Sequence, residues 1–542
     1  MYFEEIKSTQ KGKTYKSYLI RENYREKGKV KHRTICNLSK LPEKHILQIK
    51  KLMKGERGTF NIDDLENGKT YEYGASYAFI ALAKEIGLNK IIYSKQEQWV
   101  KDVMAMIIGK IIYQGSKLYL TNMYQDTALW ELSGHKFGVR PDVEEHCYAP
   151  MDNLMIRKNK IEKKLATKHL QDGCIVLYDM TNTWVEGKYE NSKIAVYGGK
   201  PKGGKKGYKI IAIGLITNKE GCPVGVEIFK GSTSDQTTVL GEVQKLSKKY
   251  GLKDIVFTGD RGMLTQKRID EVNAESFNTV TAFTHTQINS LIKTKNISTE
   301  DFKENNFKEI IDFEDKRVRY ILCKSKKTML EERATRKSMI DRVKENLISK
   351  AKVKQRRDKV KVAASVGRLF QKYKIEKFFD WEVDETGGFK WSLKKEVIEK
   401  EKALDGCYII RSDVSQDKLS SKEIVETYRD LQKVEQAFRN LKTVLLELRP
   451  LYHKTDDRIK SHIFIASLAY YIQWHAMRRL KPLFDSDGKY KEKRWDISVV
   501  IERLKSIRKV ENLINGVVVK TNISKPDTEQ KMILDLLNVK LG

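Results

Sequence analysis

The chain has 542 residues, with 104 Lys and Arg against 72 Asp and Glu, and so carries a net charge of +32. This length exceeds the size at which one hydrophobic core stops growing, so two to four domains are expected, and no repeat or low-complexity segment points to a solenoid or a disordered chain. The charge favours a polyanionic partner, with nucleic acid foremost, although an anionic lipid surface or a ribosomal or scaffold role would show the same excess.

The cysteines and the apolar segments bear on the cellular compartment. Six cysteines are far apart and form no CxxC pair, which indicates a reducing compartment and no zinc site. The amino-terminal residues lack the basic and then apolar pattern of a signal peptide. Apolar segments such as residues 103–108 are interrupted long before membrane-spanning length. We therefore expect a soluble, cytoplasmic protein with no membrane partner.

Residues 1–70 are expected to form an N-terminal β-hairpin region. Strand patterns at residues 15–24 and 30–38 flank a turn-like stretch at residues 26–29. Lys and Arg crowd both strands, which suits contact with DNA phosphates but is equally common on the solvated faces of strands.

Residues 71–170 change to a helical period and are expected to form a helical DNA-binding region. Tyr77, Ile80 and Ile86 mark the face of one helix, and Val103 lies on a second. No helix-turn-helix signature is visible. Two prolines in residues 135–170 place a domain boundary there.

Residues 171–286 alternate between strand and helix patterns. The apolar run at residues 174–178 delivers Asp179, and a second run at residues 255–259 delivers Asp260. A carboxylate at the C-terminal end of a buried strand occupies the place where open α/β sheets carry their chemistry, although turns and caps use Asp as well. Three strands followed by helix, strand, helix and strand is the element order that an RNase H-like domain shows, and we expect the first part of such a core here.

The loop between the first two strands of that core combines glycine with lysine. Glycine lets the backbone approach a phosphate closely, and lysine supplies charge, so the loop could grip nucleic acid. A solvated hairpin tip has the same composition, and the spacing is not that of a P-loop. The lysines concerned are Lys200, Lys202, Lys205 and Lys206.

Residues 287–415 are expected to form an insertion domain with strand-like flanks at residues 317–322 and 406–410. Between them, residues 326–374 are predicted to form one long helical segment with 17 Lys and Arg against 5 Asp and Glu. Such a helix can lie along a duplex or can be merely solvated.

The strongest helix pattern in the chain spans residues 421–446 and opens the second part of the core, residues 416–480. A serine cap and Glu423 start it, and Leu431, Val434 and Phe438 lie on its core face. Tyr428, Glu435 and Lys442 follow one another at seven-residue intervals, so they stack along one edge. By itself, Glu435 with Arg439 is an ordinary i, i+4 surface pair. Residues 481–542 are expected to form a C-terminal helical region.

In this context the chain resembles the DDE transposases of bacterial insertion sequences, in particular the group with a Tyr-(2)-Arg-(3)-Glu-(6)-Lys signature. Tyr428, Glu435 and Lys442 match three of its four positions, whereas Leu431 stands where the group has Arg. The stretches around Asp179 and Asp260 look like the two Asp motifs of the group. The segment between Asp260 and Glu435 is long enough for the β-rich insertion typical of this group.

The resemblance implies a set of roles for these residues. Asp179, Asp260 and Glu435 would hold two Mg²⁺ ions, with Mn²⁺ as a substitute, and Asp179 would be the shared ligand. Tyr428 and Lys442 would hold phosphate near the scissile bond. The role of the missing Arg would fall to Arg429, Lys433 or Arg439, or be absent. The cations expected to bind DNA are Arg261, Arg429, Lys433, Arg439, Lys442 and the four lysines of the glycine-rich loop.

The implied function is binding of transposon ends followed by cut-and-paste DNA strand cleavage and strand transfer. Double-stranded DNA at the ends and at the target would be the partner, a homodimer would join the two ends, and the protein would be nucleoid-associated when bound. Two alternatives stay open: a metal-dependent nuclease of the same fold, and an inactive DNA-binding descendant, which Leu431 keeps alive. His453 and His462 are interpreted as structural, because three carboxylates need no His ligand.

Overall fold

The computed structural model describes residues 1–10, 13–26, 29–55, 65–198, 207–294, 297–304, 307–352, 358–444, 446–448, 451–486, 494–514 and 516–541. The chain divides into two compact units. The first comprises residues 1–161, 440–449 and 453–542, and the second comprises residues 162–439 and 450–452. Each unit is described separately.

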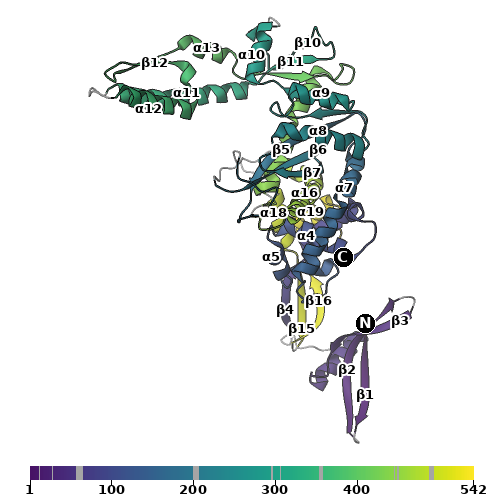
Figure 1. The fold of residues 1–542 in the computed structure, drawn as a ribbon. Coiled ribbons are helices and arrows are strands. Elements are labelled where there is room, and N and C mark those ends of the chain that lie inside the picture. Colours follow the sequence, from purple (N-terminus) through teal and green to yellow (C-terminus); the bar gives the residue numbers. More distant parts are fainter. Residues whose placement is uncertain are drawn as a thin grey trace. The chain divides into compact units, whose positions relative to one another are not determined.

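The first unit begins with a three-stranded antiparallel sheet in the order β1-β2-β3 (Figure 1). The strands are β1 (Tyr2–Gln10), β2 (Lys13–Glu26) and β3 (Lys29–Asn37). The predicted hairpin is thus confirmed as β2 and β3, with β1 added along its edge. Helix α1 (Glu43–Met53) buries Ile46 and Ile49 against this sheet, which gives the sheet a small core of its own.

The rest of the first unit is mainly helical, as the period from residue 74 predicted. Helix α4 is buried along almost its whole length and packs against α16, so these two helices form the centre of the unit. In the described residues no helix is both long enough and apolar enough to cross a membrane. The helices are α2 (Gly74–Glu85), α3 (Leu88–Ile92), α4 (Gln98–Ile112), α5 (Lys117–Asn122), α6 (Leu129–Leu132), the π-helix η2 (Glu144–Tyr148), α7 (Ala149–His169), the π-helix η6 (Asn440–Val444), α16 (Asp456–Arg479), α17 (Lys481–Ser486), α18 (Ile497–Lys505) and α19 (Thr528–Leu536).

The C-terminal region at residues 481–542, expected to be helical, contains two strands besides its helices α17, α18 and α19. Strands β15 (Arg508–Ile514) and β16 (Val517–Ile523) form a hairpin that turns at Gly516, whose φ is +76°. Strand β15 also pairs with β4 (Leu65–Glu72), which lies near the opposite end of the sequence. The pairing of such distant segments leaves no trace in local periodicity, which explains why the sequence did not predict it.

The second unit is built on an eight-stranded mixed sheet in the order β10-β11-β14-β9-β8-β5-β6-β7. The first three strands in sequence form an antiparallel meander, and β5, β8 and β9 run parallel to one another. The resulting order β7-β6-β5-β8-β9 confirms the α/β, RNase H-like fold class. The core strands are β5 (Cys174–Trp184), β6 (Ile210–Asn218), β7 (Pro223–Lys230), β8 (Ile255–Thr258) and β9 (Asn278–Ala282).

The helices of the second unit cover this sheet (Figure 1). Helix α8 packs against α9, α14 packs against β9 and β14, and α15 packs against β5 and β6. The helices outside the insertion are α8 (Asp235–Gln244), the π-helix η3 (Lys245–Lys249), α9 (Gln266–Ala274), α14 (Ser421–Arg429) and α15 (Leu431–Arg439).

The insertion between the two parts of the core extends the main sheet. The strand-like flanks expected at its two ends are β11 and β14, and β14 pairs antiparallel with β9. Its elements are α10 (His285–Thr294), the 3₁₀ helix η4 (Thr299–Asp301), β10 (Lys308–Ile311), β11 (Arg319–Lys324), α11 (Lys326–Ala351), α12 (Lys359–Tyr373), the 3₁₀ helix η5 (Glu376–Phe378), β12 (Phe379–Val383), β13 (Phe389–Leu393), α13 (Lys395–Ala403) and β14 (Cys407–Ser412).

The single long helix predicted over residues 326–374 is in fact two helices, α11 and α12, that lie side by side (Figure 1). Asp358 caps the second, because its side chain accepts a hydrogen bond from the backbone N–H of Lys361. Val343, Leu347 and Phe370 are buried between the two helices and the hairpin β12–β13. The apolar side chains between these helices therefore form a packing face, and α12 begins directly after Asp358, a good N-cap residue.

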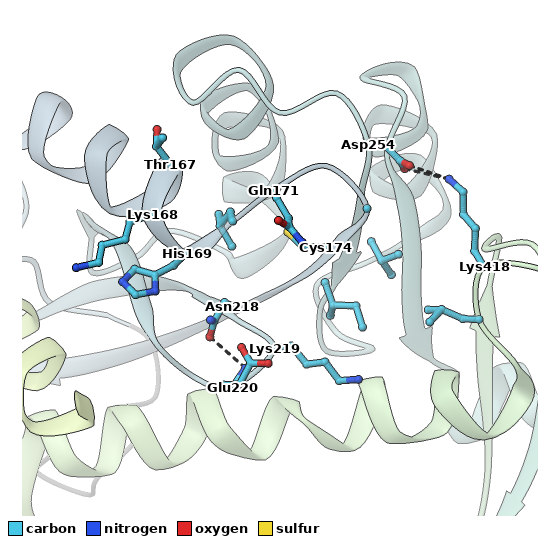
Figure 2. A pocket seen from close by; sticks show the side chains of 15 residues that line it. Thr167, Lys168, His169, Gln171, Cys174, Asn218, Lys219, Glu220, Asp254 and Lys418 are labelled. Atoms are coloured by element: carbon cyan, nitrogen blue, oxygen red, sulfur yellow. Dashed lines mark hydrogen bonds and ion pairs between the residues drawn. The ribbon is translucent and has the colours of Figure 1, made fainter. Parts of the chain in front are cut away.

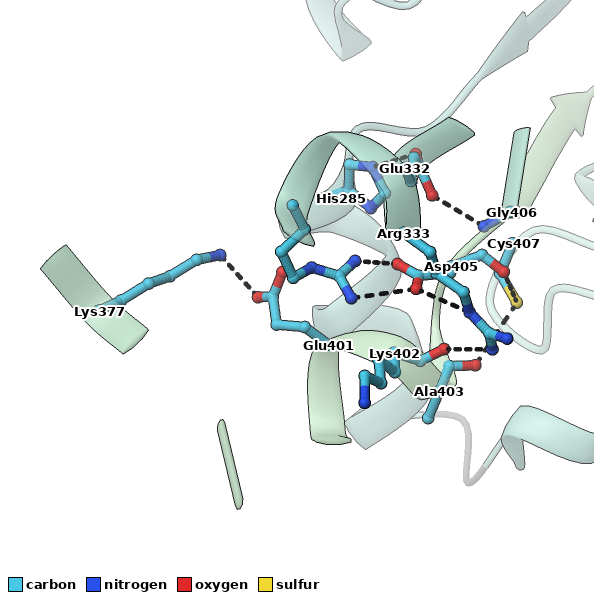
Figure 3. Close-up of polar contacts among 11 residues, drawn as sticks. His285, Glu332, Arg333, Lys377, Glu401, Lys402, Ala403, Asp405, Gly406 and Cys407 are labelled. Carbon is cyan, nitrogen blue, oxygen red and sulfur yellow. Dashed lines mark hydrogen bonds and ion pairs between the residues drawn. The ribbon is translucent and has the colours of Figure 1, made fainter. Parts of the chain in front are cut away.

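A buried carboxylate fastens the start of α11 to the main sheet (Figure 3). Asp405 is 3% exposed, just before β14, and receives hydrogen bonds from Arg333 and Arg336 of α11. Glu332 also accepts a hydrogen bond from the backbone N–H of Gly406 at 2.8 Å. Charged hydrogen bonds of this kind hold an element in one orientation.

Candidate active site

The strand register places the two aspartates side by side. Strands β5 and β8 are paired in parallel from Cys174 with Ile255 to Leu177 with Thr258. Asp179 and Asp260 each stand two positions beyond the last pair, so they continue the same register. In neighbouring parallel strands about 4.8 Å apart, residues in register point to the same face. We therefore expect their carboxylates to lie close together at this end of the ladder.

The sequence predicted that the strand ends at Asp179, and this prediction was wrong. Strand β5 continues to Trp184 because its other neighbour, β6, pairs with it beyond Asp179. Only the pairing of β5 with β8 ends before Asp179, at Leu177. Asp179 is half-buried there, and its Oδ1 accepts a hydrogen bond of 2.7 Å from the backbone N–H of Met180.

The helix that carries the third carboxylate is broken into segments. The predicted continuous helix over residues 421–446 is divided into α14, α15 and η6, with the first break at Asp430. The start is as predicted, since Ser420 and Glu423 form a capping box. The core face is also confirmed for Leu431, Val434 and Phe438, all of which are buried.

Helices α14 and α15 bring Tyr428 and Glu435 toward the aspartates. The Tyr428 hydroxyl donates a hydrogen bond to Asp260 Oδ1 at 3.3 Å. Burial raises the pKa of Tyr428 well above its usual range, and the charges of Asp260 and Glu435 raise it further. Glu435 is exposed on α15, the helix that packs against the strand of Asp179. The hydroxyl of Tyr428 is thus close enough for the charges of Asp260 and Glu435 to shift its pKa.

The structure does not support the interpretation of Glu435 as half of a surface pair, because no ion pair joins it to Arg439 in the described residues. The three carboxylates also do not form a closed cage for one ion. They are not among the groups of three ligand atoms within 4.8 Å of one another in the described part of the chain. A pair of ions about 4 Å apart needs a wider set of oxygens than one ion does. Exposed carboxylate oxygens with room for water and phosphate suit Mg²⁺.

The cations predicted to bind DNA differ in their surroundings. Arg261 is exposed beside Asp260, and Arg429 is exposed and donates a hydrogen bond to the Tyr408 hydroxyl at 2.9 Å. Lys433 donates to the backbone carbonyl of Lys219 at 3.0 Å and forms an ion pair with Asp430 at 2.8 Å. Lys433 is therefore committed to the turn between β6 and β7, which makes it the weakest candidate for DNA contact.

The other predicted cations lie at the end of the helix or outside the description. Arg439 is the exposed last residue of α15, and Lys442 is half-buried on η6. Leu431 is only 9% exposed, so the position at which the signature has Arg belongs to the core here. Lys200, Lys202, Lys205 and Lys206 lie outside the described residues.

A pocket of about 660 Å³ occurs at the other end of these strands (Figure 2). Cys174 and Ile175 at the start of β5 line it, together with Asp254 just before β8, which forms an ion pair with Lys418 at 2.9 Å. Because Asp179 and Asp260 lie beyond the opposite end of the β5–β8 ladder, this pocket is separate from the carboxylate site.

Comparisons with known proteins found two matching family models and a similar solved structure. A family model described as "Transposase DDE domain" matches residues 171–472, and one described as "IS1634 family transposase, N-terminal domain" matches residues 3–63. Among solved structures, a piggyBac transposase in a synaptic complex with hairpin DNA is similar at 10% identity and a TM-score of 0.35, covering 80% of this chain and 76% of that one. No curated protein matches significantly.

Proposed function

This chain belongs to the DDE transposases, and from that premise we propose that Asp179, Asp260 and Glu435 are its catalytic carboxylates. A DDE transposase is a metal-dependent enzyme that binds DNA, cleaves its strands and joins them. The observation that carries the residue assignment is the register of β5 and β8, in which Cys174 pairs with Ile255. The two aspartates are separated by the same interval in sequence as that pair (255 minus 174 equals 260 minus 179).

The donor set fits divalent ions with a preference for oxygen. We assign two Mg²⁺ ions to the three carboxylates, with Asp179 as the shared ligand and Asp260 and Glu435 each on one ion. Bound there, the ions would activate the attacking water or 3′-hydroxyl and stabilise the departing 3′-oxygen. Mn²⁺ should replace Mg²⁺, whereas Ca²⁺, with its longer bonds and looser geometry, should support binding without turnover.

The remaining side chains of the site orient the substrate. The phenol of Tyr428 keeps its proton because its pKa is raised, so it can donate a hydrogen bond to a phosphate oxygen as it does to Asp260. Lys442 supplies positive charge for the phosphates of the DNA strand. Arg261, Arg429 and Arg439 are the further phosphate contacts. Leu431 cannot make the contact that Arg makes in the signature.

The assembly we propose follows from the reaction. Two transposon ends must be held together with target DNA, so a homodimer would act on the DNA complex. The basic sheet β1-β2-β3 and the helical region of residues 71–170 would bind the ends, through phosphate contacts that weaken as salt rises. The enzyme would work in the cytoplasm, on the nucleoid.

The test uses linear DNA that carries the borders of the element encoding this chain. With Mg²⁺, wild-type protein should cleave the end and join a pre-cleaved end to a second duplex. Asp179→Asn, Asp260→Asn and Glu435→Gln should each abolish both products while binding the end normally, and Lys442→Ala should lower the rate less severely. Asp254→Asn, at the pocket on the other end of the strands, is the matched control.

The outcomes separate the alternatives. Cleavage without joined product would identify a nuclease of the same fold. Specific end binding with no cleavage in Mg²⁺ or Mn²⁺ would identify an inactive descendant. Wild-type cleavage by any of the three carboxylate variants would overturn the assignment of that residue.

A further inference from the structure

Away from the carboxylate site, the first unit contains a cluster of two histidines and one aspartate. Asp102 lies on α4 and is 2% exposed, His135 follows α6, and His146 lies on η2. Their ligand atoms all lie within 4.8 Å of one another. Three separate segments of the chain thus converge on one buried carboxylate.

The distances suit a bound cation. His146 Nδ1 is 3.3 Å from Asp102 Oδ2, which matches the separation of about 3.3 Å between two ligands of one tetrahedral ion with bonds of about 2.0 Å. His135 Nε2 is 2.6 Å from Asp102 Oδ1, a hydrogen-bonding distance. A shift of less than about 1 Å would put that nitrogen at the ligand separation as well.

Gln98 completes the polar surroundings of this cluster. Gln98 Nε2 lies 2.8 Å from Asp102 Oδ1, 3.0 Å from the carbonyl of Ser133 and 3.1 Å from His135 Nε2. Gln98 and His135 can both donate to Asp102 Oδ1, which explains why their two nitrogens lie near each other.

An exposed carboxylate lies near the second ring nitrogen of His146, beyond hydrogen-bond distance. His146 Nε2 lies 3.9 Å from the carboxylate of Glu145. A carboxylate behind a ligating histidine fixes its ring and increases its basicity.

We propose that Asp102, His135 and His146 bind one divalent transition metal ion of the Zn²⁺ class, with a water in the fourth position. Imidazole favours Zn²⁺, whereas the all-carboxylate catalytic site favours Mg²⁺, so the two sites select different ions. The ion fastens the segment after α6 and the start of η2 to the buried helix α4. The cysteine pattern indicated no zinc site because it could not reveal a His and Asp set that is spread over three segments of the sequence.

Co²⁺ titration of the full-length, chelator-stripped protein tests the site, because tetrahedral Co²⁺ has a strong visible absorption. Wild type and Asp179→Asn should both bind one equivalent, which separates this site from the catalytic one. His146→Ala should lose the absorption, and His285→Ala, an exposed histidine of the second unit, should keep it. Glu145→Gln, at a side chain that is 76% exposed and thus safe for folding, should weaken binding by less than about 10-fold, because its carboxylate lies 3.9 Å from the ring.

Thermal unfolding supplies the second readout. Zn²⁺ should raise the Tm of wild type by several degrees and leave that of folded His146→Ala unchanged, because only an ion bound to the native state stabilises it. Absence of saturable Co²⁺ absorption in wild type, or a wild-type titration by His146→Ala, would show that the three side chains are only a hydrogen-bonded cluster.

Discussion

The second unit holds two acidic clusters that differ in how their charge is balanced. Glu162, Glu227 and Glu242 surround Lys245, whose Nζ lies 2.9, 3.4 and 3.8 Å from their carboxylates. Burial opposes the charge of Lys245, but the three acids outweigh it and raise its pKa well above the usual range. In the described residues, Asp260 and Glu435 have no such cationic partner. A lysine of the fold balances part of the charge of the first cluster, whereas bound ions would balance the charge of the proposed catalytic carboxylates.

The largest expected effect separates activity from stability. Asp260→Asn should lower the rate of end cleavage by about 10³-fold or more, because metal-based charge stabilisation contributes several kcal/mol. The same exposed change should alter the free energy of unfolding by no more than about 0.5 kcal/mol. Cleavage assays and urea unfolding on one preparation measure both. A large loss of stability would mean that Asp260 is a structural residue like Glu162.

The converse change should act on stability. Lys245→Met leaves three buried or half-buried carboxylates without their cation and should cost about 3–5 kcal/mol in the free energy of unfolding. Urea unfolding measures this cost. Lys248→Met, further along the same element and 65% exposed, is the control and should cost less than about 1 kcal/mol. Equal effects of the two changes would show that the buried cluster is not what stabilises this face of the sheet.

Tyr428 offers a smaller, chemical probe of the exposed cluster. Tyr428→Phe removes one hydrogen bond to a charged group, worth about 1.5 kcal/mol, and should lower the cleavage rate roughly tenfold. Because the pKa of Tyr428 is raised above 10, its phenol stays protonated and the wild-type rate should show no loss from this group up to pH 10. A fall in rate near pH 9 that disappears in Tyr428→Phe would contradict the raised pKa.

The first unit supplies a third arrangement, in which buried bases lie near other bases. Burial, together with the charges of Lys117 and Arg458, lowers the pKa of His453 to about 3. The folded state therefore binds fewer protons than the unfolded state between about pH 3 and 6.5. Stability should fall as the pH drops through that window, and His453→Gln should flatten the fall. Urea unfolding from pH 7 to 4 measures it, and an unchanged slope in the variant would assign the effect to other groups.

Two buried lysines have pKa values shifted in opposite directions. Lys117 is buried beside His462, with Nζ 2.9 Å from its Nδ1, and burial lowers its pKa to about 7. Lys245 is equally buried, yet its neighbouring carboxylates raise its pKa. Burial by itself thus does not decide the charge of a side chain. The neighbours decide it, and they come from elements that are distant in sequence.

Because such neighbours come from distant elements, the sequence could predict local elements of the fold but not the contacts between them. The strands before Asp179 and Asp260 and the core face of the Glu435 helix were predictable because each depends on a local run or a local period. The spacing of the two aspartates was visible, but its equality with the register of two parallel strands was not. Local patterns likewise could not reveal the pairing of β4 with β15, or the cluster at Lys245, where α7, β7 and α8 contribute one carboxylate each.

The most direct test of the central claim is a diffraction experiment on the protein bound to its end DNA in Mn²⁺, with anomalous scattering used to locate the ions. We expect two anomalous peaks about 4 Å apart, with Asp179 on both and Asp260 and Glu435 on one each. Ions bound elsewhere in the second unit, or a Glu435 that ligates neither ion, would contradict the proposed triad.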